Sequence, residues 1–213
     1  MMDLPKLQNS LKWKWFFQYL LIFFTIPIIG TLAHELGHYL VAFIFKQPAY
    51  ISYAFTHIIP PDHLTPNPNQ FFWFIMGGPI STWITAVSGI AIIIIFYRAM
   101  HKEKEKTVGI GQTIALICTS FGIRFIFNAG GYLIFSTILG NLSNSDEVKI
   151  AEYLSLSPDL LMYGSAIIAL VLILVALYYI PRYQRYTILK AGILGGLLGY
   201  LFWYYWVGPI ILP

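Results

Sequence analysis

The sequence predicts an all-α fold, a bundle of about five helices that cross a membrane. Hydrophobic residues make up 58% of the chain and charged residues only 10%, and the mean hydropathy of +0.69 exceeds that of a typical soluble domain. The basic residues flank long apolar runs, so the net charge of +4 indicates membrane topology and not nucleic-acid binding. We expect a multi-pass integral membrane protein that contacts the lipid bilayer and forms one domain over residues 1–213.

Five apolar runs approach or exceed the length of about 20 residues that a helix needs to cross the hydrocarbon core. They cover residues 16–45, 71–97, 110–139, 160–180 and 188–212. The first and third runs are longer than a straight crossing requires, so we expect tilt or a break in them. Pro27 and Gly30 are the predicted weak points of the first run. The proline-rich connection 46–70 indicates an exposed loop or a lid.

The distribution of basic residues predicts a cytoplasmic amino terminus, because positively charged short loops are retained on that side. Most of the 13 lysines and arginines lie before the first run, between the second and third, or between the fourth and fifth. The opposite loops hold only Lys46 and Lys149, and Arg124 lies inside the third run. These opposite loops therefore belong outside, together with the acidic residues Asp62, Asp146, Glu147, Glu152 and Asp159.

The stretch TLAHELGHYL, residues 31–40, places three ionisable side chains inside the first apolar run. The spacing H-E-x-x-H puts His34 and His38 about one turn apart on one helix face, where two imidazoles can reach one zinc ion. Glu35 is offset by one residue, as expected for a base that acts on water at a metal. Burial of three ionisable groups is costly, so zinc explains the pattern better than the alternative, polar packing between helices.

An H-E-L-G-H motif inside an apolar span of a small polytopic protein resembles the site-2 protease family of intramembrane zinc metalloproteases. The resemblance implies that His34 and His38 bind zinc, that Glu35 is the general base, and that a residue from a later segment is the third ligand. It also implies hydrolysis of peptide bonds in transmembrane peptide or protein substrates. A core of this size could depend on a partner subunit for substrate selection.

The stretch FIMGGPISTW, residues 74–83, resembles the glycine-proline element that follows the zinc helix in many members of that family. Family versions usually carry an asparagine a few residues after the proline, whereas residues 81–83 are S-T-W here. Gly77, Gly78 and Pro79 are expected to loosen the helix and free backbone groups with which an extended substrate could pair. The alternative is close packing of helices through small residues.

Asp146 is the preferred third zinc ligand, although the family's usual aspartate-glycine pair does not occur in this chain. It follows the third run on the outer side, toward which His34 and His38 are displaced. Its alternative role is a loop acid that caps a helix. Other residues that stay open as the third ligand are Asp159, Glu147, Glu152 and Asn128, the last in place of the family's aspartate.

Arg124 and Asn128 lie four residues apart and share a helix face that must point into the bundle. Arg124 could stabilise an oxyanion or pair with Asp146, and Asn128 could hold the backbone of a substrate. An internal polar clamp between helices explains the same two residues.

Two other functions remain open. One is a catalytically inactive zinc-binding membrane protein that acts as a structural or assembly subunit. The other is a small transporter with a pocket at Arg124 and Asn128, although the sequence shows no inverted repeat. His57, Asp62 and His63 could form a second metal site, but the prolines around them favour an exposed loop.

Overall fold

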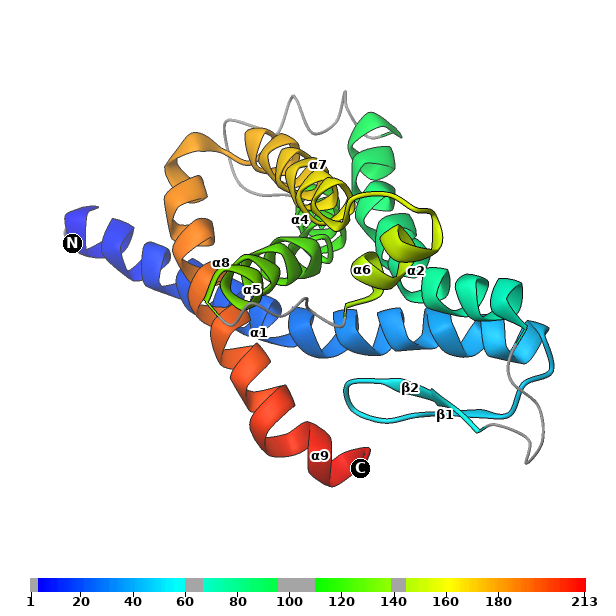
Figure 1. Ribbon diagram of the computed structural model, residues 1–213. Coiled ribbons are helices and arrows are strands. Elements are labelled where there is room, and N and C mark those ends of the chain that lie inside the picture. The colour runs from blue at the N-terminus through cyan, green and yellow to red at the C-terminus, as the bar shows by residue number, and fades with distance from the viewer. Residues whose placement is uncertain (1–3, 60–66, 96–109, 139–144) are drawn as a thin grey trace.

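The computed structural model describes residues 4–59, 67–95, 110–138 and 145–213, and it confirms the predicted all-α fold class (Figure 1). Five helical segments are long and apolar enough to cross a membrane, and each overlaps one of the five apolar runs. They are Trp13–Ile44, Pro68–Ile95, Ile110–Thr137, Pro158–Tyr178 and Arg182–Ile211. The cytoplasmic position of the amino terminus stays a prediction.

The described residues form these spans and several shorter elements. The helices are α1 (Leu4–Ile44), α2 (Pro68–Ile95), α4 (Ile110–Ser120), α5 (Ile123–Ile138), α6 (Asp146–Tyr153), α7 (Pro158–Tyr178), α8 (Arg182–Phe202), the π-helix η1 (Trp203–Val207) and α9 (Gly208–Ile211). The strands β1 (Ala49–Ile51) and β2 (Thr56–Ile58) pair as an antiparallel hairpin in the connection that was expected to be a loop.

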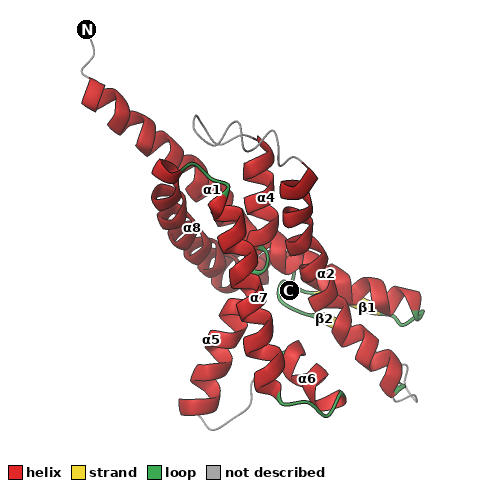
Figure 2. Cartoon of the chain, turned by 90° about the horizontal axis from the view of Figure 1, so that it is seen from above, coloured by secondary structure: helices red, strands yellow, loops and turns green. Residues whose placement is uncertain are grey.

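Helix α1 packs against α8 and α2, α2 packs in turn against α4, and α5 packs against α7 (Figures 1 and 2). Its amino-terminal half lies against α8, and its carboxy-terminal half lies against α2. A cluster of buried apolar side chains joins α1 to α2, α4, α7 and α8. It consists of Tyr19, Ile93, Ala115, Leu116, Ala176, Ile180, Ile188 and Ala191. The bundle therefore has a continuous core at the end away from the histidines.

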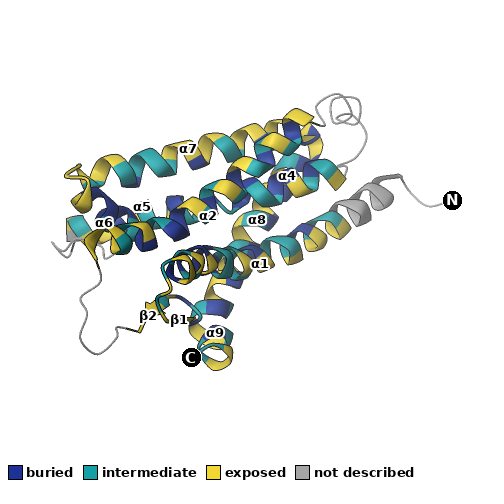
Figure 3. Cartoon of the chain, turned by 90° about the vertical axis from the view of Figure 1, so that its right-hand side faces the viewer, coloured by how far each residue is buried: buried dark blue, intermediate teal, exposed yellow. Residues whose placement is uncertain are grey.

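Exposed residues follow the outward faces of the spans (Figure 3), and many of them are large and apolar. On α7, Leu160, Ile167 and Leu174 are each more than half exposed, and on α8 so are Ile193 and Leu201. A soluble monomer rarely exposes so much contiguous apolar surface. Hydrocarbon around these faces removes that cost, which agrees with a multi-pass membrane protein.

Of the tilt or break expected in the first span, the break is absent, because α1 is one helix through Pro27 and Gly30. Proline removes one backbone hydrogen bond but does not end a helix whose neighbours hold it in place. Helix α8 holds α1 in place just before Pro27. A Cβ atom on Gly195 would overlap the backbone carbonyl of Leu20, and one on Gly199 would overlap that of Phe24. The two backbones are in direct contact there.

The third span does contain the break that its length predicted, between α4 and α5. The Thr119 hydroxyl donates to the Ala115 carbonyl at 2.9 Å, and the Ser120 hydroxyl donates to the Leu116 carbonyl at 2.6 Å. The amide of Gly122 donates to the Thr119 carbonyl at 3.1 Å, a bond of the tighter i to i+3 kind. Side-chain hydroxyls that compete for helix carbonyls thus end α4.

The hairpin and α6 lie on different sides of α1 (Figure 1). In the hairpin, Ala49 faces Ile58, Tyr50 faces His57 and Ile51 faces Thr56. Helix α6 packs against α2 and α7, and Ile150 of α6 joins a buried cluster with Ala42 and Phe74. Segments far apart in the sequence therefore meet on both sides of the H-E-x-x-H turn.

Replacement of Gly199 by valine is expected to destabilise the protein by about 1–3 kcal/mol, because the new side chain must displace the Phe24 backbone. Gly196→Val is the matched control on the same helix, since a Cβ atom there meets nothing within 4 Å. Thermal unfolding in mild detergent measures both variants. Equal midpoints for the two would show that α1 and α8 are not in backbone contact.

Candidate metal centre

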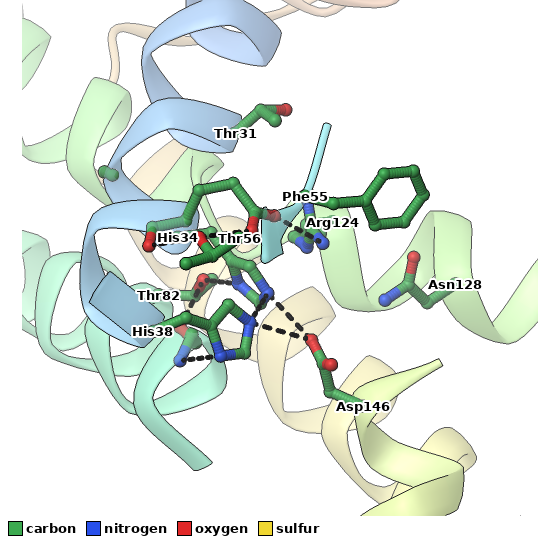
Figure 4. Close-up of polar contacts among 12 residues, drawn as sticks. Thr31, His34, His38, Phe55, Thr56, Thr82, Arg124, Asn128 and Asp146 are labelled. Atoms are coloured by element: carbon green, nitrogen blue, oxygen red, sulfur yellow. Dashed lines mark hydrogen bonds and ion pairs between the residues drawn. The ribbon is translucent and has the colours of Figure 1, made fainter. Parts of the chain in front are cut away.

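His34, Glu35 and His38 lie on α1 within the first membrane-crossing segment and are almost completely buried. Their exposed fractions are 0%, 2% and 5%. One potential ligand atom from each lies within 4.8 Å of the others. Figure 4 shows the rings of His34 and His38 side by side. The helical spacing of the motif therefore brings these side chains into one cluster.

Helix α2 fixes the orientation of both imidazole rings. The Nδ1 atom of His34 lies 2.9 Å from the Thr82 hydroxyl, which itself donates to the Gly78 carbonyl at 3.2 Å. The Nδ1 atom of His38 lies 2.7 Å from the Phe74 carbonyl, and the Gly78 amide is farther from the same nitrogen, at 3.3 Å. The Phe74 carbonyl can accept from a protonated Nδ1 of His38, and the Thr82 hydroxyl oxygen can accept from a protonated Nδ1 of His34. With a proton on each Nδ1, Nε2 is the nitrogen of each ring that can bind a metal.

The two Nε2 atoms and one carboxylate oxygen converge on a common point (Figure 4). The Nε2 atoms are 3.2 Å apart, and Asp146 Oδ2 lies 2.9 Å from Nε2 of His34 and 3.3 Å from Nε2 of His38. In the form with both Nε2 atoms unprotonated, these three atoms are all electron-pair donors, and a cation among them would remove their mutual repulsion. Ligand atoms at about 2.0–2.1 Å from a tetrahedral zinc ion are about 3.3 Å apart, so this donor set fits zinc.

Asp146 begins helix α6 and lies outside the membrane-crossing segments. Burial raises the pKa of its carboxyl, but the contacts with His34 and His38 lower it by more, so the pKa lies well below its ordinary value. The next residue, Glu147, is also buried, and burial and the Asp146 charge both raise its pKa. Both oxygens of Glu147 are 3.3 Å from the amide nitrogen of Asn128 on α5. This contact ties α6 to α5 next to Asp146.

The carboxylate of Glu35 is held from two sides by residues of other elements. The Thr56 hydroxyl, on strand β2, lies 2.8 Å from the Glu35 backbone carbonyl and 3.1 Å from its Oε2 atom. The Nη2 atom of Arg124, on α5, lies 3.8 Å from Oε1. A group that could accept a proton is thus fixed beside the imidazoles.

The expected loosening at Gly77, Gly78 and Pro79 is wrong, because α2 is helical throughout and all three residues are buried. A Cβ atom on Gly77 would overlap the backbone carbonyl of Gly37 on α1, and one on Gly37 would overlap that of Gly77. A Cβ atom on Gly78 would overlap the Nε2 atoms of both histidines. The element therefore packs α2 closely against α1 and leaves space for the rings, which is the alternative that the small residues favoured.

The other predicted site residues take different places. Arg124 forms its ion pair with Glu35 and not with Asp146, and the Asn128 amide contacts Glu147. Among the acids considered as third ligands, Glu152 and Asp159 are exposed. His57 lies 3.5 Å from the Ser52 hydroxyl and stacks on Tyr50, and the other two residues of the possible second site, Asp62 and His63, lie outside the described residues.

Two site residues were missed by the sequence analysis, Thr82 and Thr56. Thr82 was considered only as part of S-T-W, the residues that stand where the family carries an asparagine. Gly78 and Thr82 are four residues apart, so their shared helix face was a usable signal. Thr56 had no such signal, because its contact depends on the fold of the hairpin.

Comparison of the chain with models of protein families, with curated proteins and with solved structures found no match.

A Thr82→Val substitution is expected to weaken zinc binding by about 10–100-fold, because the His34 ring loses the acceptor that orients it. Competition with a chelator measures the affinity of the purified protein. Thr85→Val is the control, since the Thr85 hydroxyl donates to the Ser81 carbonyl on the same helix and has no contact with either histidine. An unchanged affinity in Thr82→Val would show that Thr82 does not orient a zinc ligand.

Proposed function

We propose that this protein is an intramembrane zinc metallopeptidase that hydrolyses peptide bonds in membrane-spanning segments. The observation that carries the proposal is the convergence of two Nε2 atoms and the Asp146 carboxylate beside Glu35, within an apolar span. Two imidazoles and one carboxylate are a common ligand set of catalytic zinc, which keeps one position open for water or substrate. The resemblance of H-E-L-G-H to the site-2 protease family supports the same function.

His34, His38 and Asp146 would hold the ion. Bound zinc makes water a stronger nucleophile near neutral pH and polarises the carbonyl group of the substrate. The contact of His34 Nδ1 with Thr82 and of His38 Nδ1 with Phe74 supports this role for the two histidines. Contacts of this kind fix the ring orientation and raise the basicity of the free nitrogen.

Glu35 would move the proton. It accepts a proton from the attacking water as the water oxygen bonds to the carbonyl carbon, and it returns a proton to the leaving nitrogen as the C–N bond breaks. The products are one carboxylic acid and one amine, with no other reactant. Thr56 and Arg124 hold the two carboxylate oxygens of Glu35 in place during this transfer.

A second candidate is a zinc-binding assembly subunit without hydrolytic activity. Its support is the engagement of both Glu35 oxygens, by Arg124 on one side and Thr56 on the other, which would leave the carboxylate less free to act on water. The two candidates share the metal centre and differ in what Glu35 does.

A Glu35→Gln variant is expected to retain zinc but to lose about 10²–10⁴ in cleavage rate, because an amide cannot take up the proton. The measurement combines zinc content with hydrolysis of a panel of membrane-spanning peptides in proteoliposomes. Equal cleavage by wild type and variant would rule out Glu35 as the base. Zinc in both proteins and cleavage by neither would favour the assembly subunit.

An Asp146→Ala variant is expected to lower the zinc content from about one ion per chain to well below it, because only two protein ligands remain. Glu152→Ala is the control, since Glu152 is an exposed acid on the same helix. Elemental analysis after dialysis against a weak chelator reports both. Full zinc retention by Asp146→Ala would remove Asp146 from the ligand set.

A further inference from the structure

A cavity of about 680 Å³ lies between α1, α5 and α8. Its walls are mainly apolar, and the polar side chains that line it include Thr31, Arg124, Asn128 and Tyr204. Every lining residue belongs to one of the spans Trp13–Ile44, Ile110–Thr137 and Arg182–Ile211. The cavity is therefore at membrane depth, where what enters it comes from the bilayer or from water.

The cavity adjoins the candidate metal centre through two of its lining residues. Thr31 lies three residues before His34, so the two side chains are about one turn apart on α1. Arg124 lines the cavity, and its Nη2 atom lies 3.8 Å from Glu35 Oε1 (Figure 4). A molecule in the cavity would thus reach the same guanidinium that contacts the proposed base.

The Nε atom of Arg124 is a buried hydrogen-bond donor that has no partner among the described residues. Such a donor costs about 1–3 kcal/mol. The Nε atom is enclosed by protein, whereas 24% of the Arg124 side chain is exposed, so an occupant with an acceptor meets that exposed part. Arg124 lies near the middle of its 28-residue span, a depth at which lipid offers hydrocarbon and no acceptor.

We propose that this cavity binds the membrane-spanning segment that is cleaved, with the segment's helix opened at the level of Arg124. This inference rests on the proposed function and adds the place where the substrate lies. A peptide fits both kinds of wall, because apolar side chains cover the apolar residues and a freed backbone carbonyl can accept from the exposed part of the Arg124 side chain. Water would hydrate Arg124 but leave the apolar walls wet, and an intact helix keeps its carbonyls in its own hydrogen bonds.

Two adjacent glycines of α5 provide a matched pair for the test. Gly131 lines the cavity and Gly130 does not, and a Cβ atom on either meets nothing within 4 Å. Gly131→Phe places a ring in the cavity, whereas Gly130→Phe places the same ring outside it. Both changes replace a helical glycine by phenylalanine, so their effects on helix propensity are alike.

The probes are two synthetic peptides of about 20 apolar residues flanked by lysines, each with a dansyl group. One is an uninterrupted Leu-Ala helix, and the other carries Gly-Pro at its centre, which opens the helix. Binding is measured in proteoliposomes by energy transfer from the tryptophans of the full-length Glu35→Gln protein, which permits binding without turnover. Zinc content of every variant reports whether the fold is intact.

We expect the Gly-Pro peptide to bind at least tenfold more tightly than the uninterrupted one. Gly131→Phe should weaken its binding at least tenfold with zinc retained, and Gly130→Phe should stay within about twofold. The same Gly131→Phe change in the active chain should lower kcat/KM for the Gly-Pro peptide by a similar factor.

Three results would overturn the cavity as the substrate site. They are equal binding by the two phenylalanine variants, failure of the Glu35→Gln protein to bind either peptide, and a Gly131→Phe variant that loses only co-purified lipid. Cleavage by the wild type with equal rates in both phenylalanine variants would leave the peptidase function standing without this site. Binding that depends on Gly131 with no cleavage by the wild type would refute the peptidase and retain the site.

Discussion

The candidate centre depends on one constraint, the contact of both Nδ1 atoms with α2. Nδ1 of His34 lies against Thr82 and Nδ1 of His38 lies against Phe74, so the two Nε2 atoms face each other, 3.2 Å apart. With both Nε2 atoms unprotonated this arrangement is costly in an apolar surrounding, and an ionised Asp146 adds a third electron-rich atom. The divalent cation of the proposed function would remove that cost.

Glycine residues at the α1–α2 contact make these Nδ1 contacts possible. The Nδ1 contacts require α1 and α2 to approach until backbone meets backbone at Gly37 and Gly77, and Gly78 leaves the volume that the two rings occupy. Any side chain at these positions would separate the helices and move Thr82 and Phe74 out of reach. The three glycines therefore set the distance between α1 and α2 that the imidazole contacts require. Helix α2 does not have to be broken at this point for the two rings to reach Thr82 and Phe74.

The sequence predicted those features that depend on local spacing. The five spans follow from apolar runs, and the cluster of His34, Glu35 and His38 follows from helical periodicity. Asp146 was chosen as the third ligand from topology and the family resemblance. The structure places it beside both histidines, and its role as a ligand stays a prediction. The sequence analysis expected tilt or a break in the first span, but α1 is unbroken at Pro27, where α8 packs against the residues just before it. Thr56 could not be found from spacing, since its contact with Glu35 crosses from a strand to a helix.

The position of Thr56 also explains why the carboxy-terminal segment contacts the hairpin. Glu35 lies nine residues before the end of α1, so the hairpin must fold back by about 13 Å toward the membrane interior to reach it. Non-helical backbone at that depth needs partners for its polar groups. The Trp203 indole donates to the Tyr53 carbonyl at 2.8 Å, and the Tyr53 amide donates to the Leu212 carbonyl at 2.9 Å. Trp203 and Leu212 thus provide hydrogen-bond partners for the backbone polar groups of Tyr53 in the hairpin. The hairpin in turn holds the carboxylate of Glu35 through Thr56.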